Sequence, residues 1–130
     1  MSEDATIKVF VYGTLRVGRF YAVLLDNFRV SCEDAQIVGT MYDAGMFPAV
    51  VETGEGTVTG ELHVYKDPNK VKLIMDQIEG YRSHDEEGSL YIRREVDVRT
   101  RKGEIEKASV YFFNQSVKHF DRIESGCWKL

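Results

Sequence analysis

The sequence predicts an α+β fold in which a twisted, mostly antiparallel and barrel-like sheet packs against one helix. Short β-prone runs recur along the chain with glycine or proline between them, which is typical of a small sheet or barrel. Residues 68–79 differ, because their apolar residues recur at helical spacing. A length of 130 residues suits a single domain, which we expect to span residues 1–130.

Composition and charge exclude several classes of function. The net charge is −4 and the basic residues are scattered, so the chain offers no basic stripe for a nucleic-acid backbone. Residues 1–6 are polar and acidic, unlike a secretory signal, and no apolar run reaches membrane-spanning length. We therefore expect a cytoplasmic protein, a monomer or small homo-oligomer, that binds neither nucleic acid nor membrane.

The first strand is expected over residues 7–12, where β-branched and aromatic residues dominate. Gly13 then frees the backbone at the point where the chain must turn. The following segment, residues 20–25, is expected to add one or two helical turns, with these side chains packed inward: Tyr21, Leu24 and Leu25.

Later strands are predicted from the positions of proline and glycine and from the alternation of apolar and polar residues. Pro48 cannot donate to a sheet ladder, so residues 46–51 are predicted to be a turn that leads into an edge strand. Residues 57–65 alternate well enough to form the next strand. Residues 91–101 and 105–113 are predicted to form a hairpin, because a short turn containing glycine separates them.

The helix over residues 68–79 is marked at both ends. Asp67 is the expected N-cap, and Pro68 occupies the first helical position, where its missing N–H costs nothing. Gly80 is expected to end the helix in a left-handed conformation. The predicted buried face follows the i, i+3, i+4, i+7 pattern and consists of Val71, Ile74, Met75 and Ile78.

Glu79 is the candidate catalytic base. It lies four residues after Met75, so its carboxylate belongs at the edge of the buried face. Desolvation and the negative end of the helix dipole both disfavour the charged form and raise its pKa, which suits a base near neutral pH. The alternative is a glutamate that reaches water or pairs with Arg82.

The loop that begins at Gly13 is the candidate anion site. Consecutive backbone N–H groups in such a loop can point at one carboxylate or one developing oxyanion. The alternative is a plain turn between a strand and a helix. A nucleotide site is excluded, because Arg19-Phe20 stands where a phosphate loop carries Lys-Ser/Thr.

Cysteine and histidine spacing predicts no metal site and no thiol catalysis. The two cysteines, Cys32 and Cys127, lie far apart and outside any CxxC pair. The three histidines are isolated from one another in the sequence. We expect two reduced thiols, with a single disulfide bridge as the alternative.

A series of short motifs runs through nearly the whole chain. It consists of Tyr12-Gly13-Thr14-Leu15 followed by Arg16 and Gly18, then Phe47-Pro48-Ala49-Val50, Gly60-Glu61-Leu62, Asp76-Gln77-Ile78-Glu79-Gly80-Tyr81, Tyr91-Ile92-Arg93 and the strand of Tyr111. In kind and order these motifs resemble those of the gamma-glutamylcyclotransferase-like superfamily. The form of the first loop resembles the gamma-glutamylamine cyclotransferase branch.

The resemblance implies a small mixed β-barrel with a central cavity and an enzyme of the acyltransferase class. The implied reaction converts a gamma-glutamyl amine or gamma-glutamyl amino acid to 5-oxoproline and a free amine, without a cofactor. It implies that Glu79 is the base and that the substrate-binding loop consists of Tyr12, Gly13, Thr14 and Leu15.

Two further tyrosines, Tyr91 and Tyr111, are possible walls of the substrate cavity, although plain strand packing explains them equally well. The sequence also leaves two other classes of function open. One is a non-catalytic module that binds a small amino-acid-like ligand in the same cavity. The other is an interaction domain in which the Gly13 loop is merely a turn.

Overall fold

The computed structural model describes residues 5–13 and 22–128. Over these residues its elements are β1 (Thr6–Val11), the 3-10 helix η1 (Ala22–Phe28), β2 (Arg29–Val38), β3 (Thr40–Asp43), β4 (Pro48–Val51), β5 (Thr57–Lys66), α1 (Pro68–Glu79), β6 (Tyr91–Thr100), β7 (Ile105–Phe113) and β8 (Asp121–Arg122).

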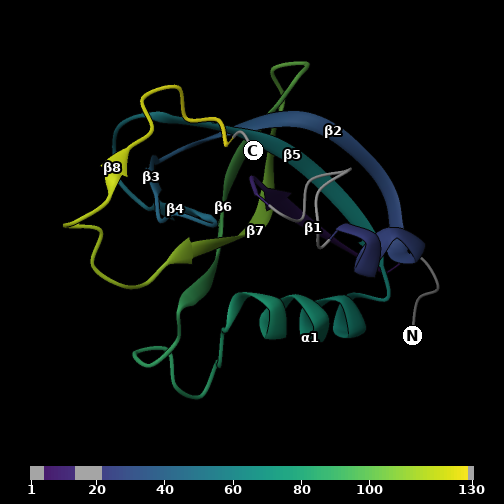
Figure 1. The fold of residues 1–130 in the computed structure, drawn as a ribbon. Helices are drawn as coiled ribbons and strands as arrows, with labels where there is room; N and C mark the ends of the chain where they lie inside the picture. The colour runs from purple at the N-terminus through teal and green to yellow at the C-terminus, as the bar shows by residue number, and fades with distance from the viewer. Residues whose placement is uncertain (1–4, 14–21, 129–130) are drawn as a thin grey trace.

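Five strands close into a barrel in the order β1-β5-β2-β6-β7, with α1 lying along one side (Figure 1). Its strand pairs are antiparallel except for β1 and β7, which run parallel where Val9 faces Ser109 and so close the barrel. A second sheet has the order β4-β3-β8. The predicted α+β fold, a mixed and mostly antiparallel barrel with a packed helix, is confirmed.

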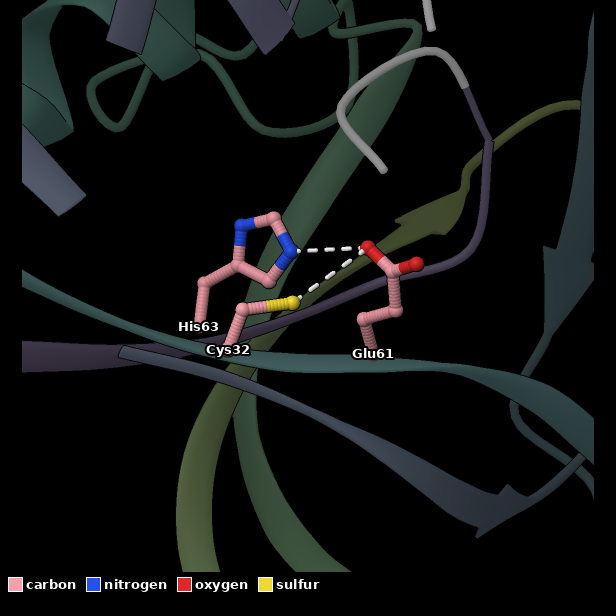
Figure 2. A group of neighbouring side chains, drawn as sticks. All are labelled: Cys32, Glu61 and His63. Carbon is pink, nitrogen blue, oxygen red and sulfur yellow. Dashed lines mark hydrogen bonds and ion pairs between the residues drawn. The ribbon is translucent and has the colours of Figure 1, made fainter. Parts of the chain in front are cut away.

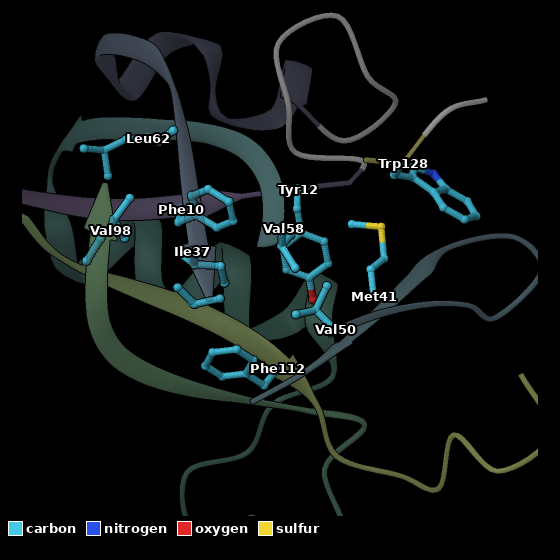
Figure 3. Close-up of a cluster of buried hydrophobic side chains, with 13 residues drawn as sticks. Phe10, Tyr12, Ile37, Met41, Val50, Val58, Leu62, Val98, Phe112 and Trp128 are labelled. Atoms are coloured by element: carbon cyan, nitrogen blue, oxygen red, sulfur yellow. The ribbon is translucent and has the colours of Figure 1, made fainter. Parts of the chain in front are cut away.

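The alternation of side chains along β1 divides the core into two clusters. Phe10 points into the barrel, where it meets Leu62, Val98 and Phe112 (Figure 3). Val9 and Val11 point the other way. They join a cluster between the barrel wall and the helices, which also holds Leu25, Tyr65, Val71, Met75 and Tyr111.

Helix α1 has the predicted bounds, Pro68–Glu79, and buries Val71 and Met75 as expected. Gly80 ends it at φ 64°, and the N–H of Tyr81 donates to the Asp76 carbonyl at 2.9 Å. The expected cap bond from Asp67 is absent. A capping side chain needs an extended backbone, whereas Asp67 is left-handed at φ 53° and ψ 61°.

The buried face of the short helix after β1 differs in part from the prediction. Leu25 is fully buried as expected, but Leu24 is 52% exposed, so its inward prediction is wrong. The segment is a 3-10 helix, in which residues three apart share a face, and Ala22 and Leu25 are its buried residues. The prediction for Tyr21 lies outside the described residues.

The predicted hairpin and edge strand are both confirmed. Strands β6 and β7 pair from Tyr91 opposite Phe113 to Arg99 opposite Ile105. Strand β4 begins at Pro48 and forms one edge of the small sheet. Within the described part of the chain, no helix combines the length and apolar character needed to span a membrane.

Truncating the barrel core should destabilise the protein strongly. Phe112 is 2% exposed and belongs to the interior cluster. Phe112→Ala is expected to cost about 3–5 kcal/mol of unfolding free energy, through lost burial and the cavity left behind. Leu73→Ala, at a 62% exposed helix position, is the control and should change stability by no more than about 0.5 kcal/mol. Chemical denaturation measures both, and equal losses would contradict the assignment of the core.

Candidate functional site

Glu79 ends α1, and the Gly80 cap fixes the direction in which the chain leaves the helix. The residue as a whole is only partly covered, whereas its carboxyl lies among closely packed atoms. Burial raises the pKa of this carboxyl from its ordinary 4.5 to about 7. The predicted rise in pKa is confirmed, with desolvation as its cause, and it brings the carboxyl into the range of a general base.

The arginines near the end of α1 are paired with other carboxylates. Arg82, the partner considered from the sequence, lies 3.2 Å from Asp85. Arg93 lies 2.6 Å from Asp76, one turn before Glu79. Among the described residues, none forms an ion pair with Glu79. The raised pKa of Glu79 is therefore caused by the burial of its carboxyl.

Two tyrosine hydroxyls lie close enough to Glu79 to sense its charge. The Glu79 carboxylate raises the pKa of Tyr12 and of Tyr91, in addition to the larger effect of their burial. Tyr12 follows β1, Tyr91 begins β6 and Glu79 ends α1. The fold thus gathers three of the residues predicted for the site from three separate elements.

Both tyrosines are anchored to the backbone through their hydroxyl protons. The Tyr12 hydroxyl donates to the Tyr111 carbonyl at 2.6 Å, and the Tyr91 hydroxyl donates to the Pro48 carbonyl at 2.6 Å. Raised pKa values keep both phenols protonated, so these hydrogen bonds persist at neutral pH. The anchors fix two phenol oxygens within range of the charge on Glu79.

Tyr111 belongs to a polar network with α1 and β6, and its role as a cavity wall stays a prediction. Its hydroxyl donates to Asp76 Oδ1 at 2.5 Å, on the same oxygen that receives Arg93 Nη1 at 2.6 Å. The Arg93 guanidinium also lies over the Tyr81 ring, 5.2 Å from its centroid. Sequence reasoning missed this network, although Asp76, Tyr81 and Arg93 all occur in the motifs on which the resemblance rests.

Gly13 lies where the backbone must approach Pro48 closely. A Cβ added to Gly13 would lie 2.9 Å from Pro48 Cγ and 3.2 Å from its Cδ, too close for either atom to stay in place. The Pro48 carbonyl also accepts the hydrogen bond from the Tyr91 hydroxyl. Because residue 13 is glycine, the backbone can pack against Pro48 without displacing the residue that holds Tyr91. Thr14 and Leu15, the other predicted loop residues, lie outside the described residues.

The described residues also show a groove of about 370 Å³ at the other end of the barrel. It is lined by Gln36, Ile37, Val38, Thr57, Asp97, Arg99 and Ile105. Tyr91 begins β6 and Arg99 lies near its end, so the length of this strand separates the groove from the Glu79 site. The predicted cavity at the Gly13 loop borders residues 14–21 and stays a prediction.

The raised pKa of Glu79 makes a prediction about stability. Between about pH 4.5 and pH 7 the unfolded chain ionises this carboxyl while the folded chain keeps its proton, so folding stability should fall as the pH rises. The full loss, about 3 kcal/mol, should be reached above pH 7. Glu79→Gln cannot ionise at this position, so it does not lose this stability. Its unfolding free energy relative to that of the wild type should therefore increase by that amount between about pH 4 and pH 8. Chemical denaturation of both proteins at both pH values measures this increase. If the difference in unfolding free energy between the two proteins is the same at both pH values, the Glu79 carboxyl is exposed to solvent rather than buried.

Comparison with known proteins identifies the family. The family described as "Gamma-glutamyl cyclotransferase, AIG2-like" matches residues 9–130, which covers the Gly13 loop, Glu79 and all of the barrel except the first three residues of β1. No curated protein gives a significant match to the sequence.

Solved structures share the fold over most of the chain. YkqA from Bacillus subtilis aligns over 95% of this chain with a TM-score of 0.69 and 29% identity, but the chain spans only 40% of that protein. An AIG2-like protein from Mus musculus has a TM-score of 0.69 and 20% identity, over 92% of this chain and 86% of its own. A gamma-glutamyl cyclotransferase aligns at a TM-score of 0.55 and 13% identity, over 91% of this chain and 70% of its own. By the match over residues 9–130, the chain belongs to the gamma-glutamyl cyclotransferase, AIG2-like family.

Proposed function

We propose that the protein is a gamma-glutamylcyclotransferase that converts a gamma-glutamyl amine or gamma-glutamyl amino acid to 5-oxoproline and a free amine. The observation that carries the proposal is the Glu79 carboxyl, which is buried, lacks an ion-pair partner among the described residues and has a pKa of about 7 beside two anchored tyrosines. Membership of the family supports the reaction class.

In the proposed reaction the substrate supplies its own nucleophile. Its α-amine is tethered to the γ-carbonyl carbon that it attacks, so folding the substrate replaces an encounter between two molecules. Glu79 takes a proton from the α-ammonium, and the resulting amine attacks the γ-carbonyl carbon, which closes the five-membered ring. Glu79 gives this proton to the leaving nitrogen as the bond between that nitrogen and the γ-carbon breaks, so that the free amine leaves. The second proton of the ring nitrogen passes to Glu79 and from there to solvent, which leaves the lactam of 5-oxoproline.

The tyrosine anchors suit the charge of such a substrate. The Tyr91 proton is already donated to the Pro48 carbonyl, so its oxygen offers lone pairs to an ammonium group. Deprotonated Glu79 attracts the same ammonium. The substrate α-carboxylate needs donors instead, and we assign these to backbone N–H groups of the loop from Gly13 to Leu15. The form of this loop motif favours the gamma-glutamylamine cyclotransferase branch and hence an amine leaving group.

Turnover of a substrate panel tests the proposal. The protein is incubated with gamma-glutamyl amines and gamma-glutamyl amino acids, and 5-oxoproline is measured. We expect release from at least one compound, a rate that rises with pH through about 7, and a loss of about 10²-fold or more in kcat for Glu79→Gln. Glu87→Gln, in the exposed loop that follows, is the matched control and should keep full activity. An unchanged rate in Glu79→Gln removes Glu79 from the mechanism, and ligand-induced thermal stabilisation without product indicates a binding module.

A second test addresses the Gly13 loop. Gly13→Val should abolish binding of gamma-glutamyl ligands, because its side chain displaces Pro48 and the Tyr91 anchor. Thr14→Ser should be mild, since it keeps the backbone donor. Calorimetry gives affinity and thermal unfolding shows whether each variant is folded. A folded Gly13→Val protein that binds normally, or a loss of binding that only mirrors a loss of folding, contradicts the assignment.

A further inference from the structure

Three side chains capable of binding a metal ion meet on the outer face of the barrel, between β2 and β5 (Figure 2). Cys32 on β2 lies directly opposite His63 on β5. Glu61 lies two residues before His63 on the same strand, so all three side chains emerge on one face. Sequence spacing gave no sign of this group, because the register of two strands that are distant in sequence brings it together.

The ligand atoms of these residues are close enough to share one ion. Glu61 Oε1 lies 2.9 Å from His63 Nε2 and 3.7 Å from Cys32 Sγ, and the three ligand atoms all lie within 4.8 Å of one another. Tetrahedral zinc, with Zn–N and Zn–O bonds of about 2 Å and a Zn–S bond of about 2.3 Å, holds its ligands roughly 3.3–3.6 Å apart. Side-chain shifts of about an ångström or less would therefore seat the ion.

His63 is already held as a metal-binding histidine would be. It is fully buried, and its Nδ1 lies 2.5 Å from the Tyr65 hydroxyl. Without a metal ion, Nε2 donates its proton to the Glu61 carboxylate, which can only accept. An ion would take the place of that proton, and the remaining ring proton, on Nδ1, would then be donated to the Tyr65 hydroxyl. Metal-binding histidines generally have such a partner on the second ring nitrogen, which fixes the tautomer and the ring orientation.

The mixture of donors selects the metal. A thiolate and an imidazole favour a borderline-soft transition metal over Mg²⁺ or Ca²⁺, and one sulfur, one nitrogen and one oxygen suit Zn²⁺. Cys32 is exposed, which gives an ion access from solvent and leaves room for water as a fourth ligand. We propose that Cys32, Glu61 and His63 form a zinc site that links β2 to β5.

The experiment uses the full chain, reduced and freed of metal, with Co²⁺ as a spectroscopic probe and Zn²⁺ as its competitor. The wild type should develop the thiolate-to-cobalt charge-transfer band and the intense visible bands of tetrahedral Co²⁺, and Zn²⁺ should abolish both. Cys32→Ser should lose the charge-transfer band. Cys127→Ser, which alters the other cysteine of the chain, is the matched control and should retain it.

Affinity separates a built site from chance coordination. Tyr65→Phe keeps the three ligands but removes the partner of His63, so it should weaken Zn²⁺ binding by roughly 10- to 100-fold. Zinc should also raise the melting temperature of the wild type and of Cys127→Ser, but not that of Cys32→Ser. Absence of binding to the wild type, or a charge-transfer band that survives in Cys32→Ser, overturns the proposal. Equal loss in Cys127→Ser does so as well.

Discussion

Strand β1 packs into two hydrophobic clusters and lies next to two other strands. It pairs with β5 on one side and meets β7 on the other, and its alternate side chains fill the barrel interior and the layer beneath the helices. No face of its buried half is left for solvent, since the residues from Val9 to Tyr12 are all at most 7% exposed. Any shift of register in β1 would move apolar groups in both clusters. The position of Tyr12, and of the loop that follows it, is therefore set by packing on both sides of the strand.

The chemistry at Glu79 arises from the same packing. A carboxyl at the end of a helix gains nothing from the helix dipole, and here no ion pair among the described residues offsets its burial. The fold holds it in place because the Gly80 cap and the buried residues Val71 and Met75 determine where the last turn of α1 ends. The stability that is lost on ionising Glu79 is the same free energy that makes it a stronger base than an exposed glutamate.

Local signals in the sequence were sufficient for several elements. The helix has a proline at its start, a glycine at its end and a periodic apolar face, so its bounds could be predicted. The hairpin could be predicted from its turn. Leu24 was misplaced because a 3-10 helix repeats every three residues, and the cap at Asp67 failed because its backbone is left-handed. Closure of the barrel by the parallel contact of β1 with β7 left no local signal.

The site could be predicted only where one element carries its own evidence. Glu79 follows from counting along the helix, whereas its approach to Tyr12 and Tyr91 depends on three elements meeting. Asp76, Arg93 and Tyr111 join across the helix and two strands, and Cys32 meets His63 across a strand pair. Such contacts depend on register and closure, which are decided by the packing of the whole chain.

The anchors of Tyr12 and Tyr91 both end on main-chain oxygens rather than on side chains. A carbonyl is present whatever residue occupies a position, so sequence drift at the position of Tyr111 removes the bond from its hydroxyl to Asp76 but leaves the acceptor for Tyr12 intact. The two anchoring tyrosines have no such freedom, because each bond is made by the hydroxyl of the tyrosine side chain itself. In descendants of this chain, the residues that provide the accepting carbonyls can therefore change, whereas Tyr12 and Tyr91 stay constant.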